Sequence, residues 1–315
     1  MMKVKLKKIC FNHSFIFFLF CNIFSLLFLK IDISIMSPLI CLLLILLIGV
    51  SHGSLDHIKG KKLLKRFNLK NISIFYFTYL LLAISIAILW TLFPATSLII
   101  FLIVASYHFG KEDTQFLLDE KSFVNQLLFF LKGALIILAP LFFHFDETMF
   151  IFKLLLIQNE SFYSSMTFIE NNRLLSVGIF ISTLSSIFLF LKKFEYRNFA
   201  IFLDFFSIII INFYFSPLIA FTIYLCFLHS IRHSISLIIE LDHENIKNGL
   251  FIFIKKALPL TFLTAIFFLI GMYFLNKNYS FDSSILKLIF IGLASLTFPH
   301  ILLEYLIEKN EKQRN

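Results

Sequence analysis

Long apolar segments separated by short polar ones recur along the whole chain. Most run for roughly 16 to 24 residues, which at ~1.5 Å per residue lets a helix cross a hydrocarbon core of ~30 Å. The pattern predicts ten transmembrane helices, at Phe11–Leu29, Ser37–Val50, Ile72–Phe93, Ser97–Phe109, Phe123–Phe143, Leu174–Leu191, Phe199–Phe215, Leu218–Ile239, Ala257–Leu275 and Ile285–Ile307. We therefore expect an all-α fold, a polytopic integral membrane helical bundle, with residues 1–315 forming a single membrane-embedded domain.

The segment Phe145–Arg173, between the fifth and sixth predicted helices, departs from this pattern. It is richer in polar residues, and its apolar run Ile151–Ile157 is too short to span a bilayer. We therefore expect irregular structure in this segment.

Composition agrees with a membrane location. Hydrophobic residues make up 59% of the chain, charged residues make up 15%, and the mean hydropathy is +0.90, so the chain is far more apolar than a typical globular domain. The cysteines form no CxxC pair. Neither a disulfide framework nor a thiolate metal site is therefore indicated.

The charged residues predict the orientation of the chain. The formal net charge is +9, and Lys and Arg gather at one end of the predicted helices, within residues 3–8, 59–70, 192–197, 255–256 and 309–314. Because cytoplasmic loops are enriched in Lys and Arg, we expect both termini in the cytoplasm and a multi-pass protein of the cell (inner) membrane. The basic residues form no contiguous stripe, so we expect no nucleic-acid partner.

Histidines stand out inside the predicted helices. Five of the nine lie within helices or at their ends, namely His52, His108, His229, His233 and His300. Counted from the outer helix ends they lie about 12 to 16 residues in, or roughly 18–24 Å deep. Four helices thus place histidines in one layer of the cytoplasmic half of the bilayer. Ionisable groups at such depth are costly and usually mark a functional site.

The spacing of the histidines favours a metal site. His229 and His233 are four residues apart, about 40° around a helix, so both can bind one ion from a single face. His52 and His57 are five apart, about 140° around, so both can face one ion only if the helix ends between them. The deeper His52 is the better candidate. Imidazoles without thiolates suit Fe, Zn, Cu or Ni, and the spacing does not choose among these metals.

Two carboxylates share a spacing relative to the histidines. Asp56 follows His52 by four residues, and Glu304 follows His300 by four. Residues four apart lie on one helix face, and carboxylates commonly orient metal-binding imidazoles by accepting their second N–H. Asp56 and Glu304 are therefore candidates to support a ligand or a water.

Four segments, taken in order, resemble a known family. They are HGSLDH at 52–57, YHFGKED at 107–113, HSIRH at 229–233 and PHILLE at 299–304. With them the chain resembles, over nearly its whole length, the Brp/Blh family of integral-membrane β-carotene 15,15′-dioxygenases. The resemblance implies an iron-dependent enzyme that uses O2 to cleave the central double bond of β-carotene into two molecules of all-trans-retinal.

The resemblance also implies roles for particular residues and partners. The Fe(2+) ligands that it implies are histidines of the first three segments, namely His52, His108, His229 and His233. Asp56 would be a further catalytic residue. Possible alternative ligands, or supports of the ligands, are His57, His300 and Glu304. The implied partners are β-carotene, O2, membrane lipid and a microbial rhodopsin that receives the retinal.

Three other functions can be compared with the same pattern. Membrane di-iron desaturases and hydroxylases use clustered boxes with HxxHH pairs, which this chain lacks. A metal or proton transporter would place polar residues along the full membrane depth and often shows repeated halves, whereas here the outer helix halves carry few polar residues and no repeat is evident. A non-catalytic carotenoid-binding or rhodopsin-assembly protein would keep the same motifs, so the sequence leaves that alternative open.

Overall fold

The computed structural model describes residues 2–28, 37–117, 122–192 and 194–312. The chain is 87% helical and the described residues contain no strand, so the predicted all-α fold is confirmed. In chain order the helices are α1 (Met2–Phe28), α2 (Pro38–Leu44), α3 (Asp56–Arg66), α4 (Ser73–Leu92), α5 (Pro94–Glu112), α6 (Phe123–Gly133), α7 (Leu135–Phe143), α8 (Phe145–Leu154), α9 (Glu160–Asn171), α10 (Leu174–Leu191), α11 (Ala200–Tyr214), α12 (Pro217–Ile223), α13 (Ile231–Leu241), α14 (Ile246–Leu275) and α15 (Phe281–Lys312).

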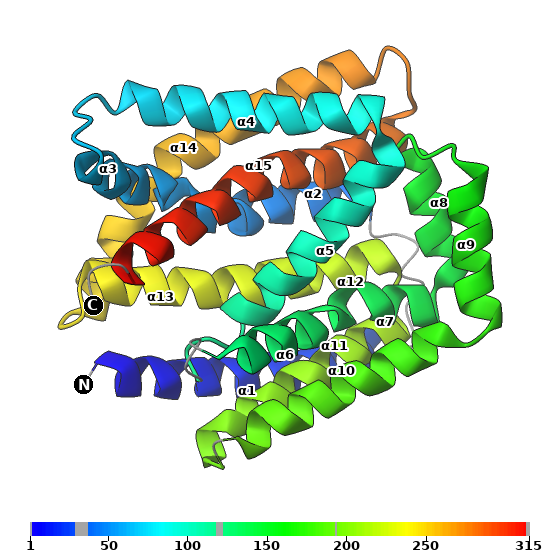
Figure 1. The fold of residues 1–315 in the computed structure, drawn as a ribbon, viewed down its shortest axis with the longest axis horizontal. Helices are drawn as coiled ribbons and strands as arrows, with labels where there is room; N and C mark the ends of the chain where they lie inside the picture. The colour runs from blue at the N-terminus through cyan, green and yellow to red at the C-terminus, as the bar shows by residue number, and fades with distance from the viewer. Residues whose placement is uncertain (1, 29–36, 118–121, 193, 313–315) are drawn as a thin grey trace.

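Within the described part of the chain, nine helical segments are long and apolar enough to cross a membrane. A tenth crossing is counted if Pro38–Gly49 and Gly53–Arg66, which are bent by 40° at a short break, form one broken span. This number agrees with the ten predicted helices. The start of α1 and the end of α15 lie at the same end of the bundle, as an even number of crossings requires (Figure 1). That this end faces the cytoplasm stays a prediction.

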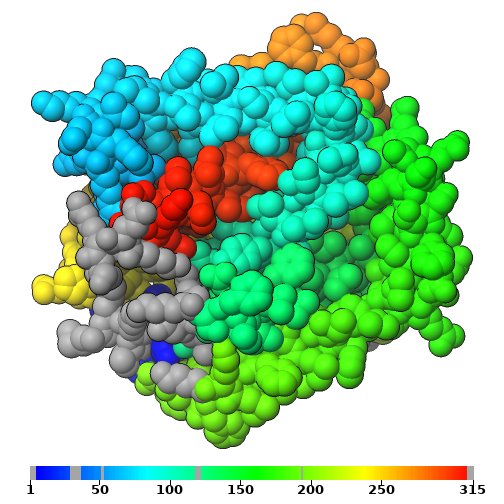
Figure 2. Space-filling model, in the orientation of Figure 1, coloured from blue at the N-terminus to red at the C-terminus, as the bar shows by residue number. Residues whose placement is uncertain are grey.

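The outer surface of the bundle is suited to lipid. In α4 and α14 only 6% of the most apolar window is buried, and apolar side chains such as Phe77 (70% exposed) and Leu269 (71% exposed) point outward. Continuous apolar surface of this kind is rare on soluble proteins, whereas hydrocarbon chains solvate it. On one face of the bundle, α15 lies between α4 and α5 (Figures 1 and 2).

The prediction of irregular structure in Phe145–Arg173 is wrong, because most of this segment forms α8 and α9. Acidic Asp146 and Glu147 lie in the first turn of α8, where the helix dipole favours negative charge. Asn159 caps α9, since its side chain accepts a hydrogen bond from the Phe162 N–H. Both helices are short, so neither crosses the bilayer alone.

Two glycines bring α5 and α6 into backbone contact. A Cβ atom on Gly110 would lie 1.8 Å from the carbonyl oxygen of Phe129, and one on Gly133 would lie 1.8 Å from that of Ser106. Only glycine allows this approach, which is the usual role of small residues between membrane helices. The contact fixes the end of α5 that carries the YHFGKED segment.

Helix irregularities coincide with two of the histidine segments. A π-helical turn spans Ile45–Gly49, a 3-10 turn follows at Ser51–Leu55, and a second π-helical turn spans Tyr224–Ser230. The Ser230 hydroxyl donates a hydrogen bond to the Gly49 carbonyl at 3.2 Å, which joins the two π-helical turns. Single π-helical turns are frequent at functional sites. The apolar pattern predicts a regular helix over Leu218–Ile239 and does not reveal the π-helical turn that contains His229.

Candidate metal centre

Four histidines from separate parts of the chain meet in the interior. His108 lies on α5, His229 in the second π-helical turn, His233 on α13 and His300 on α15, and each is at most 7% exposed. The ring centroid of His108 lies 5.4 Å from that of His229 and 5.5 Å from that of His300. The rings of His233 and His300 are 5.7 Å apart. These four residues, called the histidine layer below, are linked by these short ring-to-ring distances.

The HGSLDH segment lies at the break between α2 and α3. The backbone of His52 belongs to the 3-10 turn Ser51–Leu55, but its side chain lies outside the described part of the structure. The Nδ1 atom of His57 lies 2.9 Å from the Ser54 carbonyl oxygen, so this ring is tied to its own turn. The regular helix is therefore interrupted at this segment.

Three histidines of the layer are each oriented by a carboxylate on another element. The Nδ1 atom of His300 lies 2.8 and 3.0 Å from the two carboxylate oxygens of Asp56. Nδ1 of His229 lies 3.2 Å from Asp113, and Nδ1 of His233 lies 3.0 Å from Glu112. A metal-bound imidazole commonly donates its other N–H to a carboxylate in this way. In each ring the arrangement directs Nε2 away from that carboxylate.

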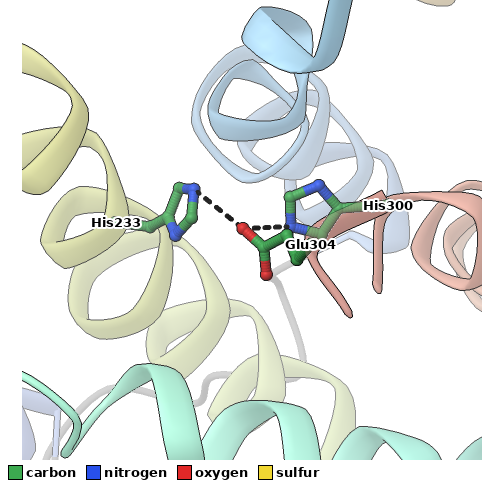
Figure 3. Close-up of side chains that lie close together, drawn as sticks. All are labelled: His233, His300 and Glu304. Carbon is green, nitrogen blue, oxygen red and sulfur yellow. Dashed lines mark ion pairs between the residues drawn. The ribbon is translucent and has the colours of Figure 1, made fainter. Parts of the chain in front are cut away.

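The Glu304 side chain lies between two of these Nε2 atoms (Figure 3). Its Oε1 atom is 3.9 Å from His233 Nε2 and 3.7 Å from His300 Nε2. His233, His300 and Glu304 can place one ligand atom each within 4.8 Å of one another, and so can the group His108, Glu112 and Glu304. Glu304 Oε1 also accepts a hydrogen bond from the Lys59 ammonium at 2.8 Å, which balances its negative charge.

Two tyrosines and one arginine hold the carboxylates. The Tyr79 hydroxyl donates to Asp56 at 3.0 Å, and the Tyr224 hydroxyl donates to Asp113 at 2.7 Å. Arg232 donates to the Asp113 carbonyl at 3.0 Å and pairs with both carboxylate oxygens of Asp204 at 2.6 and 2.9 Å. Paired, hydrogen-bonded charges are the form in which ions are tolerated in an interior.

Sequence reasoning missed Glu112 and Asp113 as individual residues, although both lie in the YHFGKED segment. A signal existed for Glu112, because it follows His108 by the same four-residue spacing as Asp56 follows His52. In the structure, however, Glu112 contacts His233, and Asp56 contacts His300. No local spacing predicts those partners, because they lie on helices far apart in the sequence.

An apolar cavity of about 650 Å³ adjoins the histidine layer. His108, His229 and His300 form part of its wall, together with Asp56 and His57. The remaining wall is mostly aliphatic and aromatic and comes chiefly from α4, α14 and α15. The volume falls within the usual range for small-molecule sites, ~300–1,000 Å³. The cavity can therefore hold a large hydrocarbon next to the polar groups in its wall.

Fold and site together define a polytopic membrane protein whose buried histidine–carboxylate centre borders an apolar cavity. Comparison with known proteins assigns the family: residues 43–308 match the model of the β-carotene 15,15′-dioxygenase family, and the chain belongs to this family. It is 28% identical over 272 residues to a β-carotene 15,15′-dioxygenase of an uncultured marine bacterium, 66A03, an alignment that covers 83% of this chain and 90% of the relative. No solved structure matches the chain.

Proposed function

We propose that this protein uses O2 to cleave the central 15,15′ double bond of β-carotene into two molecules of all-trans-retinal. The observation that carries the proposal is a buried histidine–carboxylate layer in the wall of an apolar cavity. Family membership and the named relative support the same reaction. An apolar cavity open to lipid would take up a hydrocarbon without first transferring it through water.

We further propose that the centre binds Fe(2+). The side chains fit this ion, because His233, His300 and Glu304 form a set of two imidazoles and one carboxylate, the set typical of non-haem Fe(II) oxygenases. His52, His108 and His229 stay proposed ligands on the family resemblance, and the geometry adds His300 and Glu304. The described cysteines are buried and none belongs to either candidate ligand group, so no thiolate competes.

Each part of the site has a defined task in the proposed reaction. Bound iron would supply the binding and activation of O2. Asp56, Asp113 and Glu112 keep the Nδ1 proton on their histidines, which leaves the Nε2 lone pairs available to the ion. Asp56 is therefore a positioning residue that acts through His300. The apolar wall excludes water and holds the polyene. One O2 and one double bond yield two aldehydes, so no external reductant is needed.

Expression in β-carotene-producing bacteria tests the function. The pigment should bleach and all-trans-retinal should accumulate, and folded, iron-loaded protein that forms no retinal would refute the proposal. His233→Ala and His300→Ala should lose retinal formation and bound iron together. His243→Ala is the matched control, because that side chain is 63% exposed and lies outside the centre. Metal analysis, followed by chelation and reloading with Fe(2+) or Zn(2+), separates iron from the other metals.

We also propose that the protein resides in the cell (inner) membrane and delivers retinal to a microbial rhodopsin. The nine apolar spans of the described residues support a multi-pass membrane location. Co-expression with a retinal-free opsin should produce the coloured rhodopsin, and it should not do so with His300→Ala.

A further inference from the structure

The cavity beside the histidine layer reaches the outer surface of the bundle. Four residues both line the cavity and are exposed on the outside: Tyr76 (43%) and Leu80 (49%) on α4, and Leu263 (45%) and Phe267 (52%) on α14. On each helix the two residues are four positions apart and share one face. The cavity therefore opens sideways, between α4 and α14.

This opening faces hydrocarbon. The α4 span carries no charged residue, and α14 carries none from Ala257 to Leu275. Figure 1 shows α14 running behind α4, and both helices pack on α15. The nearest cation of α14, Lys256, precedes the cavity-lining residue Leu260 by four positions, or ~6 Å along the helix. The opening thus begins about one helical turn inside the basic end of the helices.

On α4 the opening borders the histidine layer. Its residue Leu80 follows Tyr79, whose hydroxyl donates to Asp56, and Asp56 in turn is bonded to His300. A side entrance at this position leads to the polar centre without crossing the length of the cavity.

From the centre the cavity extends in the other direction along α15. The lining residues of α15 run from His300 back to Leu288, a distance of ~18 Å along a helix. At the far end α14 and α15 are tightly packed, because a Cβ on Gly271 would lie 2.8 Å from the Leu288 side chain. This arm of the cavity is therefore closed.

We propose that the opening between α4 and α14 is the entrance through which a rod-shaped polyene hydrocarbon reaches the centre from the lipid. One half of the molecule lies in the closed arm, the other half lies in the opening, and its middle lies at the histidine layer. A polyene about as long as the ~30 Å hydrocarbon core has a half-length of ~15 Å, which the closed arm accommodates. This inference rests on the proposed function and adds the route and the position of the substrate.

Reversible blocking of the entrance tests the proposal in full-length protein. The native cysteines are buried, so an exposed cysteine introduced as Leu80→Cys or Leu263→Cys is the site that a bulky disulfide-forming reagent reaches. Phe77→Cys and Phe262→Cys are matched controls, because these residues are 70% and 69% exposed on the same two helices but do not line the cavity. Blocking either entrance position should slow retinal formation by about tenfold or more. A reducing agent should restore the rate, which makes each protein its own folding control.

A binding measurement separates failure of the entrance from failure of the function. The single tryptophan, Trp90, is buried, and its ring centroid lies 6.1 Å from that of the cavity residue Phe101. Added β-carotene should quench its fluorescence, and the blocked entrance variants should slow this quenching while the blocked controls do not. Unchanged quenching rates in the blocked entrance variants would overturn the entrance, even if retinal forms. Slowed quenching without any retinal formation would uphold the entrance and refute the proposed function.

Discussion

Replacing Asp56 by asparagine removes one negative charge from the centre and leaves the side-chain volume nearly unchanged. Both oxygens of Asp56 contact His300 Nδ1, at 2.8 and 3.0 Å, and the two side chains are 6% and 4% exposed. The asparagine amide can still present one oxygen to the ring, but the charge-assisted hydrogen bond is lost. Loss of such a partner costs about 10- to 100-fold in metal affinity, or ~1.4–2.7 kcal/mol.

The affinity should be measured by chelator competition on purified protein, with retinal formation as the second readout. Tyr79→Phe should have a smaller effect of ~1 kcal/mol, about fivefold, because it removes only the hydrogen bond to Asp56 and leaves the carboxylate in place. Asp282→Asn makes the same chemical change at an exposed position of the same helix that carries His300, and it should change neither readout.

The order of the effects decides between two interpretations. If Asp56 positions a metal-bound His300, iron affinity must fall from wild type to Tyr79→Phe to Asp56→Asn. Wild-type iron affinity in Asp56→Asn would refute this reasoning and would remove His300 from the proposed ligands.

Three further changes probe the packing around the site. Gly110→Ala should destabilise the protein by ~1–3 kcal/mol and lower its melting temperature, because the added methyl group would overlap a backbone carbonyl of α6. Gly53→Ala is the control and should leave the melting temperature nearly unchanged, because its Cβ would lie 3.9 Å from its nearest neighbour. Phe268→Ala enlarges the closed arm of the cavity beside Gly292, so chromatography of the products should reveal cleavage away from the central bond. Exclusively central cleavage would contradict the role of that arm. Arg232→Leu should cost ~3–5 kcal/mol by leaving Asp204 buried and unpaired, and a second change, Asp204→Leu, should recover most of the loss in thermal unfolding experiments.

The all-α fold and the membrane spans could be predicted from the sequence alone. Crossing a bilayer requires about 20 apolar residues in a row, a local property that is visible without knowledge of the neighbouring helices. Counting along each helix also placed His108, His229, His233 and His300 at a common depth, because the rise per residue of a helix is constant. The helices α8 and α9 were missed, since a short, partly polar segment carries no such signal.

Only the tertiary structure decided which residues face one another. Asp113 and His229 are 116 positions apart, and Asp56 and His300 are 244 apart. Their contacts depend on the rotation of each helix about its axis, which the π-helical turn at Tyr224–Ser230 and the close approach of α5 and α6 set. The cavity and its opening likewise exist only between helices. Depth in the bilayer follows from composition and counting along one helix, whereas side-chain partners follow from packing among several.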